Sequence, residues 1–443
     1  MSIKTDDKIQ IDIVRSDVGS ESGEEVARVE ELERFDIRQD GGLTAWLQVF
    51  GCWLLFMNTW GLTNSFAVFE TYYLDTKFPS TSPSTISWVG SLQLFLTLFV
   101  GIFAGWFLDA GRLRPVLVAG IAFEVLGMLG TSFCRKYWQV IIAQGLCVGI
   151  GSGTLAFTSA AVIPFYFTKR RMLAAGIVST GSSIAGVVYP LMMRELFKRL
   201  GFGWAVRVLA LIMLVCSSIS LLVLKPHTKS KTRPAFFMAS FLRDMPYTLF
   251  ILSYAFMVAG TYVPYFYIQK YALDLSINDH TTFNVISIMN AATFFGRFPY
   301  NYMADMYGGI AVLVPCCLLT SLILFLWRFV HNLAGLIVIS ATFCFITGGL
   351  VSLPAPTIAN LTVDKAEYRT RMGMGYTVAA IGALVGNPIA GAARTGGNGM
   401  TASEVMQRWQ GAWFFAATSM TIATVLMIWA RILRGGLDMN KKL

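Results

Sequence analysis

Residues 166–181 read YFTKRRMLAAGIVSTG and lie between two long apolar runs. The first half of this stretch clusters Lys169, Arg170 and Arg171, and such basic clusters stay on the cytoplasmic side of a membrane. The second half places Gly176 and Gly181 at the start of the next apolar run, where small residues let neighbouring helices approach closely in lipid. The stretch therefore predicts a membrane helix that begins at the cytoplasmic face and packs tightly against other helices.

The composition of the whole chain agrees with a membrane protein. Of 443 residues, 55% are hydrophobic and only 14% are charged, and the mean hydropathy is +0.60. This is more apolar surface than a soluble globular protein buries. Apolar runs of about 20 residues recur along the chain, which is the length of a membrane-crossing helix, whereas barrel strands would alternate. We predict an all-α integral membrane fold with 12 transmembrane helices.

The formal net charge of +10 is spread over the chain and does not form one patch. Residues 1–40 hold six Lys and Arg against twelve Asp and Glu, out of totals of 35 and 25, which leaves 29 basic and 13 acidic residues elsewhere. These fall in predicted loops and at helix ends, so we expect a lipid bilayer and no nucleic acid as the partner. The basic excess favours loops on the cytoplasmic side and both termini in the cytoplasm.

The only long polar interruption of the apolar region lies at its middle and is basic. It divides the chain into two sets of six predicted helices, in the manner of a duplicated unit. We predict these segments: a disordered acidic cytoplasmic tail (1–40), a first six-helix bundle (41–224), a basic cytoplasmic linker (225–245), a second six-helix bundle (246–433) and a short cytoplasmic tail (434–443).

Motifs for a cofactor or for catalysis are not evident in the sequence. The seven cysteines lie in or at the ends of apolar runs without CxxC spacing, so we expect packing roles and neither disulfides nor a metal site. The segment GIGSG (149–153) follows no strand and lacks the lysine of a phosphate-binding loop. We therefore expect no cofactor, no metal and no enzymatic activity.

Six separated motifs carry a resemblance to a known family. The chain resembles the major facilitator superfamily over residues 40–433, and within it the monocarboxylate-porter branch of fungal type. The resemblance implies two pseudo-symmetric bundles that enclose a central cavity and operate by alternating access. The motifs are DGGLTAW (Asp40–Trp46), NSFAVFETYY (Asn64–Tyr73), YFTKRRMLAAG (Tyr166–Gly176), GFGWAVR (Gly201–Arg207), NAATFFGR (Asn290–Arg297) and GNPIAG (Gly386–Gly391).

The loop after the second predicted span is similar to a family motif. It contains Asp109, Gly111, Arg112 and Arg114. The resemblance implies that this loop latches the cytoplasmic gate, with Asp109 binding helix ends or arginines in one state. A topological anchor is the alternative. At the matching place in the second half stands Asp305, which supports a duplicated unit.

Polar residues inside the predicted spans are the candidates for substrate binding. Arg297 lies in the cytoplasmic half of span eight, where an unpaired guanidinium costs on the order of several kcal/mol, so it should face a cavity or a partner. Its planar donor fork suits a carboxylate or another anion of a substrate. Snorkelling or a pair with an acid on another helix are the alternatives. The further candidates are Asn64, Asn290, Asn387 and Tyr262, which equally suit helix–helix contacts or an interfacial aromatic belt.

Glu124, near the middle of span three, is the candidate for proton coupling. Burial favours the neutral form of a carboxyl group, so the group can be protonated in one state and charged in another. A permanently neutral hydrogen-bonding group is the alternative. In animal relatives that move protons with lactate-like acids, a lysine and an aspartate stand where this chain has Asn64 and Thr293. The resemblance therefore implies neither that coupling route nor lactate as the substrate.

Three functions fit the sequence. The first is a secondary carrier of a small organic anion or related polar metabolite, monocarboxylate-like, with or without coupled protons, in the plasma membrane or alternatively the vacuolar membrane. The second is an exporter of a fungal secondary metabolite. The third is a membrane receptor or scaffold without transport, which would suit longer tails than this chain has.

Overall fold

The computed structural model describes residues 41–225, 241, 243–275, 279–330, 332–362, 367–393 and 402–435. The predicted tail of residues 1–40, residues 226–240 and 242 of the linker, and residues 436–443 lie outside the described part. Throughout these ranges the secondary structure is helical, without a strand. The predicted all-α fold class is therefore confirmed.

The amino-terminal half begins with a helix that is interrupted at Ser65, whose hydroxyl donates to the carbonyl of Gly61 at 2.7 Å. The next helix begins with Ser82 as its N-cap and Pro83 at its first position, a favourable start for a helix. The elements are α3 (Leu43–Asn64), α4 (Phe66–Tyr72), η1 (Tyr73–Lys77), α5 (Pro83–Phe99), α6 (Gly101–Asp109), α7 (Leu113–Phe133), α8 (Tyr137–Val140), η2 (Ile141–Val148), α9 (Gly149–Val162), η3 (Ile163–Phe165) and α10 (Arg171–Val223).

The carboxy-terminal half follows after residue 243. Gly308 has a φ of 96°, a left-handed conformation that glycine tolerates, and it separates two of these helices. The elements are α11 (Met245–Asp274), α12 (Asp279–Tyr307), α13 (Gly309–Leu326), η5 (Trp327–Phe329), α14 (Leu333–Ser352), α15 (Pro354–Leu361), α16 (Tyr368–Ala392) and α17 (Ala402–Gly435).

Twelve membrane passes are present in the described residues. Nine helical segments are long and apolar enough to cross a membrane, and one of them is the 53-residue α10. Helix α10 makes two passes because Gly201, with a φ of 74°, reverses the chain inside it. Helices α3 and α12, of 22 and 29 residues, are less apolar but long enough to cross a bilayer, and counted with them the passes reach the predicted twelve.

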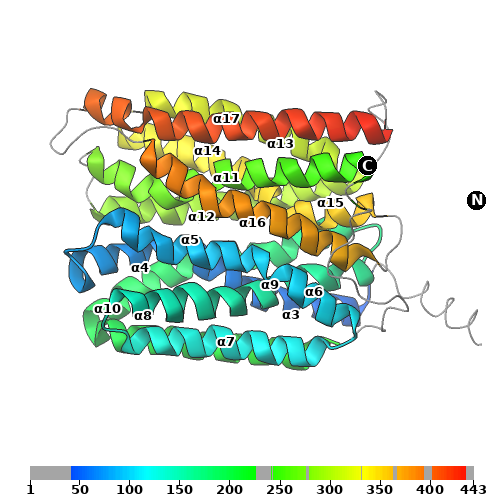
Figure 1. Cartoon of the computed structure of the whole chain (residues 1–443), viewed down its shortest axis with the longest axis horizontal. Coiled ribbons are helices and arrows are strands. Elements are labelled where there is room, and N and C mark those ends of the chain that lie inside the picture. Colours follow the sequence, from blue (N-terminus) through cyan, green and yellow to red (C-terminus); the bar gives the residue numbers. More distant parts are fainter. Residues whose placement is uncertain are drawn as a thin grey trace, which may run out of the picture.

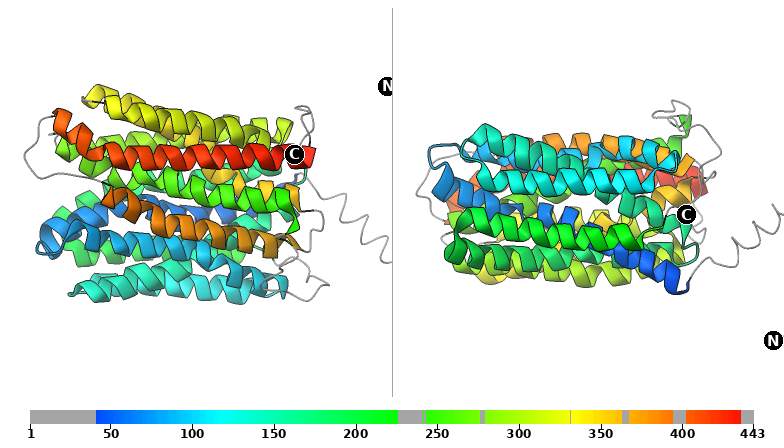
Figure 2. Two further views of the ribbon diagram at one scale, coloured as in Figure 1. Left: turned by 45° about the horizontal axis from the view of Figure 1, so that its top comes forward. Right: turned by 90° about the horizontal axis from the view of Figure 1, so that it is seen from below.

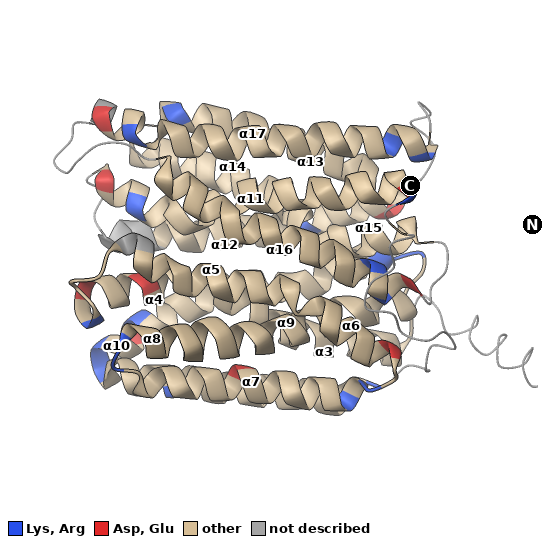
Figure 3. Ribbon diagram, viewed as in Figure 1, with Lys and Arg blue, Asp and Glu red and all other residues tan. Residues whose placement is uncertain are grey.

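The passes form two bundles that lie side by side. In Figure 1 the helices α3 to α10 occupy the lower half of the molecule and α11 to α17 the upper half. The same division appears in the two turned views of Figure 2. Charged residues gather at the two ends of the helices and leave the middle largely uncharged (Figure 3). This distribution, together with exposed apolar side chains such as Leu126, Leu222 and Val338, suits an embedding in lipid.

The two glycines of the opening stretch sit at helix crossings, as predicted. A Cβ atom at Gly181 would lie 2.5 Å from the carbonyl oxygen of Trp53 in α3. A Cβ atom at Gly176 would lie 2.6 Å from the Cγ atom of Asn301 in α12. Helix α10 therefore contacts its own bundle through Gly181 and the opposite bundle through Gly176.

Candidate functional site

Arg297 lies on α12 where the two bundles meet, and its side chain is 1% exposed. Its Nη2 atom donates to Ser182 Oγ of α10, in the opposite bundle, at 2.9 Å. The Nε and Nη1 atoms have no hydrogen-bond partner among the described residues. No carboxylate of the described part lies within ion-pair distance of the guanidinium. Neither snorkelling nor a pair with an acid on another helix is therefore found in these ranges.

Two tyrosines of α11, Tyr262 and Tyr265, lie near the guanidinium. The ring of Tyr262 stacks on Trp60 of α3, with centroids 6.3 Å apart. Tyr265 lies within hydrogen-bond distance of Thr293, 3.1 Å between the two oxygens, one helical turn before Arg297. The site thus combines one buried cation with an aromatic contact between the two bundles.

The asparagines predicted to bind substrate lie in different settings. Asn387 is buried, and both atoms of its amide lack a partner in the described part of the chain. Asn290 donates to the carbonyl of Ile286 at 3.1 Å and leaves its Oδ1 atom unpartnered against Gly186. Asn64 is half-buried and lines a small cavity of about 10 Å³ with Tyr262. A cavity of this size holds at most a single water molecule.

Glu124 lies inside the amino-terminal bundle. Its side chain is fully buried, and its Oε1 atom accepts from Ser152 Oγ of α9 at 2.8 Å. The second carboxylate oxygen has no partner among the described residues. The carboxyl group is therefore buried as predicted, at the contact of α7 with α9, and its role in proton coupling stays a prediction.

One end of the molecule, which we call the latch end, is closed by Asp109 at the end of α6. Its Oδ1 atom accepts from Arg369 Nη1 of α16 at 3.0 Å, and the same nitrogen donates to the carbonyl of Leu108 at 3.2 Å. The guanidinium also lies 4.4 Å from the ring centroid of Phe165. This buried pair joins the two bundles across 260 positions of sequence.

Asp305 forms a second contact between the bundles at the latch end. Here the carboxylate belongs to the carboxy-terminal bundle and its partners belong to the amino-terminal bundle. Its two carboxylate oxygens accept from the backbone N–H groups of Met172 and Leu173, each at 2.9 Å. These are first-turn donors of α10, which have no partner within the helix and attract negative charge. The predicted echo of Asp109 by Asp305 is therefore visible as two carboxylates, each reaching from one bundle to the other.

Arg112 and Arg114 are exposed beside this latch. They take part in none of the ion pairs found among the described residues. Of the predicted gate motif, only Asp109 belongs to such a pair. Gly111, which precedes Arg112, has a φ of 75°, so the motif needs glycine there. A role of the two arginines at the gate stays a prediction.

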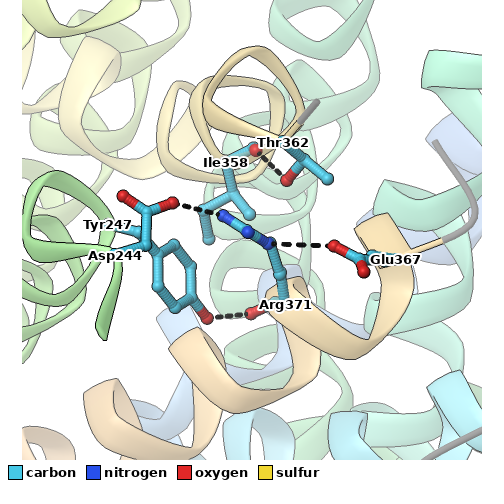
Figure 4. A network of polar contacts seen from close by, with 6 residues as sticks. All are labelled: Asp244, Tyr247, Ile358, Thr362, Glu367 and Arg371. Carbon is cyan, nitrogen blue, oxygen red and sulfur yellow. Dashed lines mark hydrogen bonds and ion pairs between the residues drawn. The ribbon is translucent and has the colours of Figure 1, made fainter. Parts of the chain in front are cut away.

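Arg371 lies two residues after Arg369, about 200° around the helix, and faces its own bundle. Its Nη1 atom donates to Asp244 Oδ2 at 2.7 Å, and its backbone carbonyl accepts from the hydroxyl of Tyr247 at 2.6 Å. Figure 4 shows this network, with Glu367 on the other side of the guanidinium at 3.7 Å. Arg371 thus anchors the start of α16 to the start of α11, and this holds Arg369 in place.

The opposite end, which we call the vestibule end, contains a larger cavity. It has a volume of about 490 Å³ and lies between η1 and α5 of one bundle and α11 and α16 of the other. Exposed residues Asp75 and Pro79 line it, so it reaches the surface. Glu70 and Phe266 line both this cavity and the small one beside Tyr262. The bundles are thus joined by Asp109 and Asp305 at the latch end, whereas at the vestibule end a cavity lies between them and Gln269 Nε2 of α11 donates to Thr71 Oγ1 of α4 at 2.7 Å.

The two bundles are thus joined by polar contacts, and a buried cation lies where they meet. The family model described as Major Facilitator Superfamily matches residues 43–283 and 249–442. The chain belongs to the Major Facilitator Superfamily. It is a transporter of that superfamily, and as such it binds a small-molecule substrate within a membrane.

Several fungal relatives of this superfamily transporter are similar over most of their length. An MFS-type transporter, dbaD, of Emericella nidulans is 38% identical over 87% of this chain and 85% of the relative. The aspyridones efflux protein apdF of the same fungus is 31% identical over 80% of this chain and 72% of the relative. The agnestins efflux protein AgnL12 of Paecilomyces divaricatus is 30% identical over 78% and 80%. These matches do not specify the monocarboxylate-porter branch, which stays a prediction.

Arg369, the partner of Asp109, is not among the candidates predicted from the sequence. The apolar run of the eleventh predicted span extends from about Met372 to Ala393 and leaves Arg369 and Arg371 in the preceding loop, whereas α16 begins at Tyr368. The sequence does contain one indication of this pairing. Two arginines stand two residues apart just before a span, and carboxylates stand at the ends of other spans.

Proposed function

We propose that this superfamily transporter exports a fungal secondary metabolite that carries an acidic group on a largely apolar body. The observation that carries this proposal is Arg297, a fully buried cation without a carboxylate partner among the described residues. A buried, unpaired charge is expensive, so a ligand that supplies the missing anion gains strong charge-assisted hydrogen bonds. The Nε and Nη1 atoms offer N–H donors to an anion, and a bidentate pair with a carboxylate would use one of them together with the second N–H of Nη2.

The aromatic surfaces beside Arg297 support an apolar body rather than a two- or three-carbon acid. Trp60 and Tyr262, from opposite bundles, stack on each other, so the contact between the bundles beside Arg297 is aromatic and apolar. The efflux proteins among the relatives support export of such compounds. A small monocarboxylate-like anion is the second candidate, and the resemblance of the NAATFFGR motif (Asn290–Arg297) favours it.

The proposed orientation follows from charge. Lys169, Arg170 and Arg171 precede α10 at the latch end, and basic clusters of this kind stay in the cytoplasm. We therefore propose a cytoplasmic latch end, an external vestibule end, both termini in the cytoplasm and location in the plasma membrane. The two transport halves would be residues 41–224 and 246–433, joined by the linker 225–245. In this orientation the described conformation is closed towards the cytoplasm.

Glu124 is the proposed site of proton coupling. It is a fully buried carboxyl group with one hydrogen-bond donor, Ser152, and one free oxygen among the described residues. Such a group changes its protonation when its surroundings gain or lose water during the conformational cycle. Export of an anion in exchange for external protons would then use Glu124 in one bundle and Arg297 in the other.

The test is a comparison of metabolites inside and outside fungal cells that carry or lack this chain. We expect at least one acidic, largely apolar compound to accumulate inside the cells that lack it. Restoring the wild-type chain should return the compound to the medium, whereas Arg297→Ala at equal membrane abundance should not. An unchanged distribution of all compounds, or full export by Arg297→Ala, would refute the proposed role.

A further inference from the structure

A chain of buried polar side chains crosses the interior of the amino-terminal bundle. Tyr189, in the first pass of α10, is 3% exposed, and its hydroxyl donates to Asn58 Oδ1 of α3 at 3.0 Å. The amide nitrogen of Asn58 donates in turn to the carbonyl of Met213 at 3.0 Å and to Ser217 Oγ at 2.9 Å, both in the second pass of α10. The chain thus joins three of the six passes of this bundle.

The chain lies at the same depth in the bundle as Glu124. Tyr189 lies near Glu124. The register of α7 against the second pass of α10 agrees, because Arg207 Nε donates to Ser132 Oγ near the end of α7 at 3.2 Å. These are the third and sixth passes, so they run antiparallel, and Glu124 and Met213 each lie about two helical turns inward from that contact.

The direction of the hydrogen bond between Tyr189 and Asn58 follows from Met213. A backbone carbonyl only accepts, so the amide nitrogen of Asn58 must face it. The amide oxygen of Asn58 is thereby turned towards Tyr189, and because this oxygen also only accepts, the single phenol proton lies between the two side chains. In this conformation Tyr189 therefore has lone pairs, and no proton, to offer to Glu124.

The surroundings of Glu124 then favour the neutral form of its carboxyl group. Ser152 donates to Oε1 at 2.8 Å, Oε2 has no partner among the described residues, and no ion pair in that part of the chain includes Glu124. A buried carboxylate needs a cation or several donors, whereas a protonated carboxyl needs one acceptor for its O–H. Tyr189 supplies lone pairs for that O–H.

The other titratable groups of the elements packed against α7 do not offset a charge on Glu124. Helix α10 contributes the thiol of Cys216, which lies near the tyrosine, and Arg207 about two turns away. The segment η2 contributes the thiol of Cys147. Helix α6 contributes Asp109, which is paired with an arginine of the opposite bundle. Helix α9 contains no titratable residue.

The chain leads from Glu124 to the contact between the bundles. Asn58 precedes Trp60 by two residues on α3, and Trp60 stacks on Tyr262 of the opposite bundle. When Glu124 loses its proton, the carboxylate attracts the hydroxyl of Tyr189, because a hydrogen bond to a charged group is stronger than one to an amide. Asn58 then loses its donor. A change of charge inside one bundle thereby acts on the helix that touches the other bundle.

We propose that Tyr189 and Asn58 are positioning residues for the proton of Glu124. In the conformation closed at the latch end they hold Glu124 in its protonated form, and the hydroxyl of Tyr189 turns from Asn58 to Glu124 when the proton leaves. This assignment deepens the proposed coupling role of Glu124 and rests on it. The device has two states, because the one phenol proton serves either Asn58 or Glu124.

The test follows the protonation of Glu124 by infrared spectroscopy. The purified chain is studied in phosphatidylcholine nanodiscs over a range of pH, without a transported compound. A protonated carboxylic acid has a carbonyl stretching band of its own, and the band of Glu124 is identified by its absence in Glu124→Gln. We expect this band in the wild-type chain at neutral pH, and the pH at which half of it is lost is the measured midpoint.

Two substitutions should move the midpoint in opposite directions. Tyr189→Phe removes the donor that stabilises the carboxylate, so the midpoint should rise by about one pH unit or more, a tenfold tighter hold on the proton. Asn58→Leu removes the competing acceptor and frees the phenol proton for the carboxylate, so the midpoint should fall by about one unit. Tyr271→Phe is the matched control, because Tyr271 is fully buried and donates to the carbonyl of Val330 at 2.9 Å in the other bundle. It should leave the midpoint unchanged.

Three results would overturn the proposal. They are a wild-type spectrum at neutral pH without a band that Glu124→Gln removes, a midpoint in Tyr189→Phe that is unchanged or lower, and shifts of the same sign in Tyr189→Phe and Asn58→Leu. A general loosening of the bundle admits water in both variants and moves both midpoints in the same direction, so opposite signs separate positioning from packing. Where Asn58→Leu does not fold, Tyr189→Phe decides alone.

The infrared measurement involves neither a compound nor a gradient, so its failure leaves the export proposal standing. Transport that keeps its pH dependence in Glu124→Gln would refute the coupling role and leave the measured protonation unaffected. The two failures are therefore distinguishable.

Discussion

Replacing Asp109 with asparagine should open the latch end. The change keeps the size of the side chain and removes its charge, so Arg369 loses a charged acceptor at 3.0 Å. The side chains of Arg369 and Asp109 are only 9% and 5% exposed, so water does not replace the lost partner. A hydrogen bond to a charged group contributes about 1.5 to 3 kcal/mol. Since the pair exists only while the bundles meet, the closed-to-open ratio should fall by roughly 10-fold to 150-fold.

The assay is the distance between spin labels at Val118→Cys on α7 and Tyr307→Cys on α12, exposed positions of opposite bundles, measured in phosphatidylcholine nanodiscs without added ligand. We expect the population with the long distance to grow in Asp109→Asn. Glu195→Gln is the matched control, because Glu195 forms an exposed pair with Arg199 on α10 and such pairs contribute little. That variant should keep the wild-type distribution.

Asp305→Asn should act in the same direction, because the asparagine loses the charge that attracts the N–H groups of Met172 and Leu173. Asp109 and Asp305 contact different partners, so the free-energy effects of the two substitutions should add in the double variant. A closed-to-open ratio that does not change in Asp109→Asn, with normal thermal unfolding, would refute the latch. So would a ratio that rises.

The remaining predictions concern the buried groups and the helix crossings. Arg297→Lys keeps the charge but loses the donor fork, so affinity for the exported compound, measured by isothermal titration, should fall at least tenfold; equal affinity would contradict bidentate binding. Glu124→Gln keeps the hydrogen bond with Ser152 but cannot titrate, so transport into proteoliposomes should lose its dependence on a pH gradient; retained dependence excludes Glu124 as the coupling group. Gly181→Leu should destabilise the chain by about 1 to 3 kcal/mol or more, because the added side chain overpacks against Trp53. Its Tm should be lower than that of the matched Ile184→Leu variant, whose position is exposed. An unchanged Tm would show that α3 and α10 separate easily.

The fold was predictable because its determinants are local. Apolar runs of helix length, the basic cluster at Lys169 and the small residues Gly176 and Gly181 each act within one or two helices. The span ends were predicted less well. The apolar run of the seventh predicted span extends from about Pro246 to Ile268, whereas helix α11 continues to Asp274, with Lys270 and Asp274 paired along the helix at 3.1 Å outside that run.

The site was predictable only as single residues. Arg297 and Asp109 were identified because a charge inside or at the end of a span needs a partner or a cavity. Their partners depend on contacts between distant parts of the chain: Ser182 is one of many serines, and Arg369 lies 260 positions from Asp109. No local pattern encodes which of several loop cations lies opposite a given carboxylate once two bundles are placed side by side.

The most direct test of the central role of Arg297 is equilibrium exchange of the exported compound in proteoliposomes, with labelled compound outside and unlabelled compound inside. Exchange requires binding and alternating access but no driving gradient, so it does not depend on the coupling ion. We expect rapid exchange by the wild-type chain and at least a tenfold loss in Arg297→Ala of equal Tm. Equal exchange by the two proteins would show that Arg297 does not bind the substrate.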